Sequence, residues 1–136
     1  MRVLERFTER LIARQRELYT ADVPFSEKWR TAMRYLEEDL AAGYPKIWLE
    51  LQALAWNRPE LRERVARVNA EWRAVLTEAF AAARERNGVE MPLEALVALV
   101  MTFNQGMMLE RLSRIDAGHR ELLAWIEVWL ARKEAE

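Results

Sequence analysis

The chain has 136 residues, and 21 Lys and Arg side chains face 22 Asp and Glu, so its formal net charge is −1. This balance argues against direct nucleic-acid binding, because phosphate contacts need clustered basic surface. The absence of Cys excludes disulfides and thiolate metal sites. Only four Gly and four Pro occur, which favours an all-α fold. The length is that of a single domain over residues 1–136.

The first predicted helix covers about residues 2–20. Its apolar stripe consists of Leu4, Phe7, Leu11 and Leu18. Arg14 and Gln15 fall on that apolar side. Two interpretations are open: the long side chains reach out to solvent at the edge of the stripe, or they make polar contacts inside a pocket.

A second helix is predicted from Ser26, a good N-cap, to Gly43, which ends it. Its stripe has the same helical spacing and consists of Trp29, Met33, Leu36 and Leu40. Near its end lie the consecutive acids Glu37, Glu38 and Asp39, which we interpret as a solvated helix end.

The third predicted helix opens with Tyr44 and Pro45, since Pro suits the first helical position. It is apolar on nearly every side, so we expect it to lie between other elements. A long fourth helix is predicted from Glu60 to about Arg86, with one apolar stripe and a charged outer face. The pair at 87–88, Asn-Gly, predicts the turn that follows.

We expect the rest of the chain to be organised around the stretch from Pro92 to Arg114. Apart from Glu94, every residue in 93–109 is uncharged and most are apolar, which indicates a helix buried on most sides. Gly106 in its interior costs roughly 1 kcal/mol relative to Ala. We therefore expect another backbone to pass close to Gly106, either within the chain or from a second copy.

A sixth helix is predicted over about residues 118–133. Its broad apolar face consists of Leu122, Trp125, Ile126, Trp129 and Leu130. The fifth and sixth helices together carry more apolar surface than six short helices can hide in one subunit. This surplus predicts a homodimer.

The residue types needed for common catalytic and metal sites are missing. The single histidine, His119, is predicted to be exposed, and one histidine cannot supply a catalytic triad, a His-pair zinc site or a di-iron site. No Gly-rich phosphate loop occurs. We therefore expect no enzyme activity, no metal and no cofactor.

The sequence also predicts a cytoplasmic location. Residues 1–6 are charged from the start, unlike a signal peptide. The longest uncharged run, 95–109, is shorter than the ~20 residues that a membrane span needs, so we expect no membrane partner.

Three segments in order carry a family resemblance: an apolar helix at 44–51, a Pro-Glu-Leu-Arg start to a long helix within 57–62, and a Pro-initiated apolar helix at 93–112. With these segments, the chain resembles the C-terminal effector-binding and dimerisation domain of TetR-family transcriptional regulators. The match extends over the whole chain and is clearest over 44–130. The resemblance implies a six-helix bundle with a ligand cavity inside.

The resemblance also implies that the last two helices of each subunit form a dimeric four-helix bundle. Residues expected in that interface are Val97, Met101, Met108, Leu122, Trp125, Ile126 and Trp129. Family members carry an N-terminal helix-turn-helix, and we find no such motif in residues 1–136. We therefore expect no DNA binding by this chain alone, whether it is a fragment of a repressor-type regulator or a stand-alone domain.

For the cavity we predict a small apolar or aromatic effector. The predicted lining residues are Trp29, Met33, Trp48, Leu51, Trp72, Leu76, Phe103, Asn104 and Met107. Asn104 or Gln15 would be the polar anchor, because ligand pockets are mainly apolar with a few placed polar groups. The alternative is a helical homo- or heterodimerisation module without a small-molecule site, in which these side chains are plain core. A cavity of roughly a few hundred Å³ would separate the two interpretations.

Overall fold

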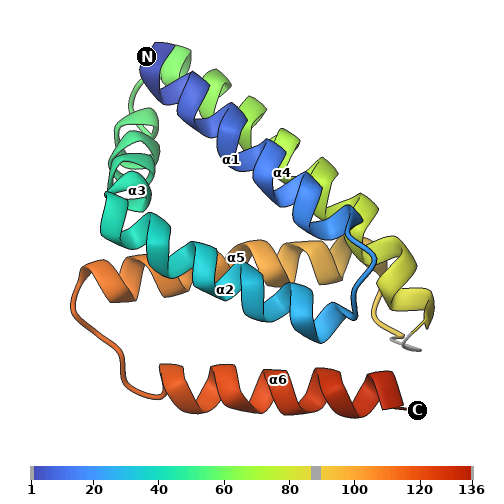
Figure 1. Cartoon of the computed structure of the whole chain (residues 1–136). Helices are drawn as coiled ribbons and strands as arrows, with labels where there is room; N and C mark the ends of the chain where they lie inside the picture. Colours follow the sequence, from blue (N-terminus) through green and yellow to red (C-terminus); the bar gives the residue numbers. More distant parts are fainter. Residues whose placement is uncertain (1, 87–89, 136) are drawn as a thin grey trace.

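The computed structural model describes residues 2–86 and 90–135, which form α-helices and no strand (Figure 1). The helices are α1 (Arg2–Thr20), α2 (Phe25–Ala42), α3 (Tyr44–Ala55), α4 (Pro59–Arg86), α5 (Leu93–Leu112) and α6 (His119–Ala135). The predictions of an all-α chain and of six helices are confirmed. The turn predicted at 87–88 lies outside the described residues.

The long helix α4 is the wall shared by most of the other helices. It packs against α1, which runs beside it, and also against α3 and α5 (Figure 1). Two apolar clusters lie along it. The first is centred on Leu11, Tyr44 and Trp48, and the second on Leu76, Phe80 and Val97.

The junction between α2 and α3 follows from local chemistry. Gly43 adopts a φ of +91°, which favours glycine, and its N–H donates to the Asp39 carbonyl at 3.0 Å. Pro45 lies in the first turn of α3, where its missing N–H costs nothing, and its side chain is fully buried. The chain therefore turns sharply from α2 into α3.

The helix α6 packs mainly along α2 (Figure 1). Ser26 does not cap α2 as predicted, because the helix already begins at Phe25 after Pro24. Instead, Ser26 is buried and donates from its N–H and its Oγ to the two carboxylate oxygens of Glu134, at 2.6 and 2.8 Å. The Glu134 carboxylate, near the end of α6, therefore joins α6 to the start of α2.

The prediction that His119 is exposed is wrong. Its exposed fraction is 9%, and its Nε2 lies 2.9 Å from Oε1 of Glu110. This contact joins the start of α6 to the last turns of α5. The spacing of nearby residues could not reveal it, because the connecting turn decides where the ring points.

The expectation that another part of the chain passes close to Gly106 also needs correction. A Cβ added at Gly106 would meet nothing within 4 Å, and the residue is exposed, so no other part of the described chain passes close to it. The approach of a second copy stays a prediction. The expectation that α3 lies between other elements is confirmed, since it packs against α2, α4 and α5. It still leaves Ile47 and Leu54 about half exposed.

We predict that Glu134→Ala lowers the free energy of unfolding by about 1–2 kcal/mol, because both Ser26 donors lose their charged acceptor. Urea unfolding measures this loss. Glu127→Ala is the matched control, since it removes only the solvent-exposed pair with Arg30 and should cost less than about 1 kcal/mol. Equal losses in the two variants would contradict the anchoring role of Glu134.

Candidate functional site

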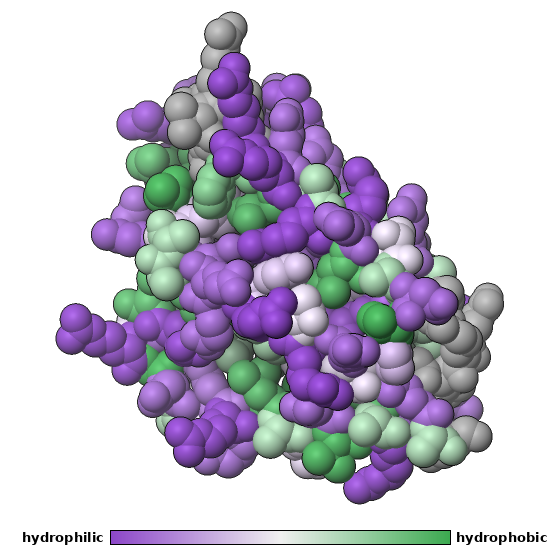
Figure 2. Space-filling model, in the orientation of Figure 1, coloured by the Kyte–Doolittle hydropathy of each residue, from purple (hydrophilic) through white to green (hydrophobic). Residues whose placement is uncertain are grey.

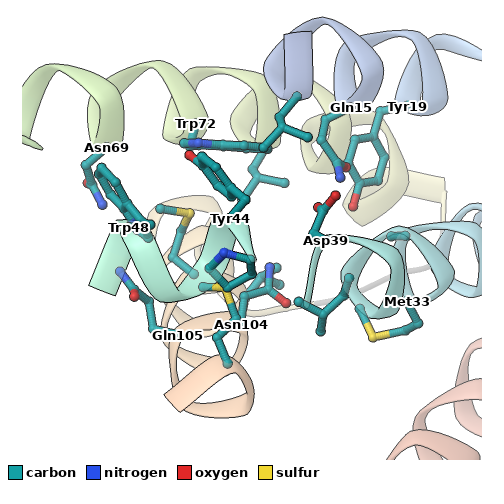
Figure 3. Close-up of a pocket in the computed structure, with 18 of the residues that line it drawn as sticks. Gln15, Tyr19, Met33, Asp39, Tyr44, Trp48, Asn69, Trp72, Asn104 and Gln105 are labelled. Atoms are coloured by element: carbon teal, nitrogen blue, oxygen red, sulfur yellow. The ribbon is translucent and has the colours of Figure 1, made fainter. Parts of the chain in front are cut away.

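A cavity of about 120 Å³ lies where α1, α2, α3, α4 and α5 converge (Figure 3). Members of both apolar clusters line it, so it lies between them. Three tryptophans, Trp29, Trp48 and Trp72, contribute to its wall from three different helices. Large rings that approach from several directions leave irregular gaps. The two clusters therefore do not pack directly against each other at this point.

Most of the predicted ligand-binding residues lie on this cavity. The residues that line it are Trp29, Met33, Trp48, Trp72, Leu76 and Asn104. Gln15, the other predicted polar anchor, also lines it. Their placement at one cavity is a structural fact, whereas their binding of a ligand stays a prediction.

Three predicted residues do not line the cavity: Leu51, Phe103 and Met107. Leu51 packs against the first apolar cluster, and the Phe103 ring packs on Trp29 at 5.8 Å between centroids. Phe103 and Met107 share a helix stripe beside the one that carries Asn104 and Met108, which face the cavity. On α5 the sequence therefore identified the lining residue Asn104, but it also included two residues of the neighbouring stripe.

The sequence interpretation of Asp39 as part of a solvated helix end is also wrong. Asp39 lines the cavity, and its Oδ2 accepts from Arg14 Nη2 at 2.7 Å. The Arg14 guanidinium also lies 4.1 Å from the centre of the Tyr35 ring. In the sequence, only the position of Arg14 on the apolar side of α1 pointed to this contact. The structure shows that Arg14 forms an ion pair there with Asp39, a residue of the cavity wall.

Several lining residues were not predicted at all, among them Tyr19, Tyr44 and Asn69. Figure 3 shows the polar ends of Gln15, Tyr19 and Asp39 pointing toward one another at one end of the cavity. In the sequence analysis, Tyr44 served only to predict the start of the third helix. A tyrosine at a helix start gives no indication of the direction of its ring, so the sequence held no usable signal.

Burial raises the pKa of two phenols at this site. The pKa of Tyr19 rises from 10.0 to about 12. The pKa of Tyr44 is also raised, first by burial, while its hydrogen bond with Thr8 lowers it. Both phenols are therefore neutral at ordinary pH.

The predicted interface residues fall into two groups. Val97 is buried in the second apolar cluster, and Met101 and Met108 line the cavity, so these three face the interior of the subunit. This corrects the predicted interface on α5. On α6, Trp125 has an exposed fraction of 64% and Leu122 is also exposed. Ile126 and Trp129 are half-buried.

No family model, curated protein or solved structure matches the chain. Within residues 2–86 and 90–135, no three or more His, Asp or Glu side chains are grouped as a metal site would require. None of the helices in this part of the chain combines the length and apolar character that crossing a bilayer needs.

The raised pKa of Tyr19 predicts a loss of stability in alkali. Below about pH 10 the phenol is neutral in both folded and unfolded chains, so Tyr19 causes no pH dependence there. Between about pH 10 and 12 the unfolded chain releases the proton first, so the free energy of unfolding falls. Urea unfolding at about pH 9 and about pH 11 should show a smaller loss for Tyr19→Phe than for the wild type. Equal losses would contradict the buried, neutral phenol.

Proposed function

We propose that the chain is the effector-binding and dimerisation domain of a TetR-like transcriptional regulator. The observation that carries the proposal is the cavity between the five helices, whose wall holds three tryptophans and a few polar groups. An apolar and aromatic wall with few polar groups is typical of sites for small organic ligands. The chain would be a cytoplasmic, non-enzymatic binding domain that does not contact DNA by itself.

The volume of the cavity limits the size of the effector. About 120 Å³ is less than the ~300–1,000 Å³ of common ligand pockets and less than we expected. It approaches the ~150 Å³ of an engineered protein cavity that holds benzene. The proposed effector is therefore a compact molecule built on one ring.

In this proposal α1 transmits the binding event. It contributes Gln15 and Tyr19 to the cavity wall and is joined to α2 by the pair of Arg14 and Asp39. An effector that contacts α1 better in one of its positions shifts the population toward that position. In a complete repressor, this movement would alter the spacing of the two DNA-reading heads.

We predict that toluene binds the cavity and changes the tryptophan fluorescence, because three lining residues are tryptophans. Ala32→Leu should weaken this binding at least about tenfold, because Ala32 is a buried lining residue and the larger side chain fills the space. Ala70→Leu, the same change on the exposed face of α4, should bind like the wild type. Unchanged fluorescence of the wild-type protein, together with no heat of binding, would end the effector proposal.

The dimerisation half of the proposal is supported by apolar side chains on the outside of the last two helices. Those exposed from α5 to α6 are Leu99, Leu109, Leu112, Ile115, Leu122, Trp125 and Val128. Figure 2 shows hydrophobic side chains at the lower edge of one face, over α6. Six of these residues lie on the two helices and Ile115 lies in the connection between them. Single exposed apolar residues are ordinary, but this many close together in the chain support an interaction surface.

The exposed Gly106 lies between Leu99 and Leu109 on the outer side of α5. The absence of a side chain there leaves room for a helix of a second copy to approach closely. We therefore retain the homodimer in the proposal, with its interface moved to the outer side of α5 and to α6.

We predict that Trp125→Glu converts the dimer to a monomer at micromolar concentration in sedimentation experiments, because a charge at the interface would be buried without a partner. Trp56→Glu is the matched control. It introduces the same charge at another exposed tryptophan, which has an exposed fraction of 73% and follows the end of α3. This variant should remain a dimer. A wild-type protein that sediments as a monomer would contradict the dimer.

The second candidate function is a helical homo- or heterodimerisation module without an effector. The same exposed surface on α5 and α6 favours it, and it does not need the cavity. Dimerisation without any binding of one-ring compounds would select this alternative.

A further inference from the structure

The polar side chains of the cavity wall differ in whether their hydrogen-bonding groups are already used. Asn69 Oδ1 accepts from Arg73 Nε at 2.8 Å. Gln105 and Gln52 form a reciprocal pair, each amide donating to the other at 3.1 Å. The carbonyl groups of Asn69 and Gln105 therefore have partners within the chain.

Two more polar groups of the wall are engaged or out of reach. The Tyr44 hydroxyl lies 3.2 Å from Thr8 Oγ1, within hydrogen-bond distance. The Oδ1 atom of Asn104 has no hydrogen-bond partner in the described part of the chain, but it is fully buried, so a molecule in the cavity cannot contact it. The polar groups that can meet a ligand therefore lie elsewhere on the wall.

Three side chains, Gln15, Tyr19 and Asp39, form what we call the polar end of the cavity. They come from α1 and α2, and Figure 3 shows their polar groups pointing toward one another. Within the described residues, the Gln15 amide, the Tyr19 hydroxyl and Oδ1 of Asp39 make no hydrogen bond, and each retains accessible surface. A ligand group that enters this end can therefore contact three unused hydrogen-bonding groups.

The carboxylate of Asp39 determines which charge the ligand can carry. Its Oδ2 accepts from Arg14 Nη2 at 2.7 Å, so the two charges compensate each other. Asp39 is the only Asp, Glu, Lys, Arg or His in the cavity wall that the described residues form. An anion would face this carboxylate, and a cation would lose its water without an uncompensated carboxylate to receive it. The polar end therefore favours a neutral group that donates a hydrogen bond to Asp39 Oδ1.

Tyr19 can donate a second hydrogen bond to the same ligand group. Its ring packs against Phe25 and Phe80, with centroids 6.3 and 5.8 Å away, so packing restricts the direction of its hydroxyl. Because burial raises the pKa of Tyr19 to about 12, the hydroxyl keeps its proton at ordinary pH. The Gln15 amide both donates and accepts, so it does not discriminate between ligand groups. Asp39 and Tyr19 together favour a group that donates and accepts.

A hydroxyl is the smallest neutral group with both capacities, and its single oxygen can donate to Asp39 while it accepts from Tyr19. We infer that the cavity binds neutral one-ring aromatic molecules that carry a hydroxyl group, and that this hydroxyl bridges Asp39 and Tyr19 at the polar end. The inference rests on the proposed function and names its effector class. A methyl group in the same place would displace water from both side chains without replacing its hydrogen bonds, which lowers affinity.

Four probes of nearly equal size separate the possible modes of recognition, because each is one aromatic ring with one further heavy atom. Phenol donates and accepts, toluene does neither, pyridine N-oxide only accepts, and N-methylpyridinium carries a positive charge. The test is a set of NMR titrations of the full chain at about pH 7, where phenol is neutral. Phenol should bind about tenfold more tightly than each of the other three, the ratio expected for one hydrogen bond to a charged group.

The variant Tyr19→Phe removes the hydroxyl and keeps the ring. It should weaken the binding of phenol about threefold to tenfold and leave the binding of toluene unchanged, since only phenol loses a hydrogen bond. Tyr35→Phe is the matched control. It makes the same change at a tyrosine of α2 outside the cavity wall, keeps the ring on which Arg14 lies, and should bind all four probes like the wild type. Equal weakening of phenol and toluene in Tyr19→Phe would overturn the role of the Tyr19 hydroxyl.

The outcomes for the wild type separate this inference from the proposed function. If toluene binds as tightly as phenol, the hydroxyl bridge is overturned, but the effector site stands. Binding of pyridine N-oxide as tight as that of phenol would exclude Asp39 as the acceptor, and tighter binding of N-methylpyridinium would overturn the preference for neutral molecules. If none of the four probes binds, both the inference and the effector site fail. These ratios decide the inference even if Tyr19→Phe does not fold.

Discussion

Helix α5 carries more apolar surface than the described part of the chain covers. Its inner side packs against α4 and α3, where Val97 and Met107 are buried. Its outer side leaves Leu99 and Leu109 in solvent, with exposed fractions of 54% and 58%. Each buried leucine-sized side chain contributes about 1.5–3 kcal/mol, so this uncovered side is a substantial unused driving force for association. The dimer that we propose follows from this imbalance.

The cavity has a different origin. The two apolar clusters are centred on aromatic or large aliphatic side chains that approach from α1, α3, α4 and α5. Bulky rings such as Trp48, Trp72 and Phe80 fill space efficiently only when neighbouring side chains interlock with them. Between the clusters the wall is completed by polar residues, several of which pair with side chains outside the wall, as Asp39 does with Arg14 and Gln105 with Gln52. The result is a small space with a wall of aromatic, aliphatic and a few polar side chains.

Polar contacts join α6 to neighbouring helices at its ends and in its middle. Glu134 receives both donors of Ser26, Glu127 pairs with Arg30, and His119 contacts Glu110. These contacts hold the ends and middle of the helix against its neighbours while Trp125 points outward. A helix attached in this way keeps an apolar face available for a partner.

The sequence alone determined the six helices, because apolar spacing and residues such as Gly43 and Pro45 act within a few positions of the chain. It also indicated the apolar surplus of α5 and α6, and six of the nine predicted ligand-binding residues do line one cavity. Only the tertiary structure decided which residues of α5 line the cavity, since Asn104 lines it while the adjacent Phe103 packs on Trp29. It alone joined Arg14 to Asp39 and Ser26 to Glu134, and it buried His119. Those contacts unite residues distant in the chain, or residues across a turn whose path the local pattern does not determine, so local periodicity carries no information about them.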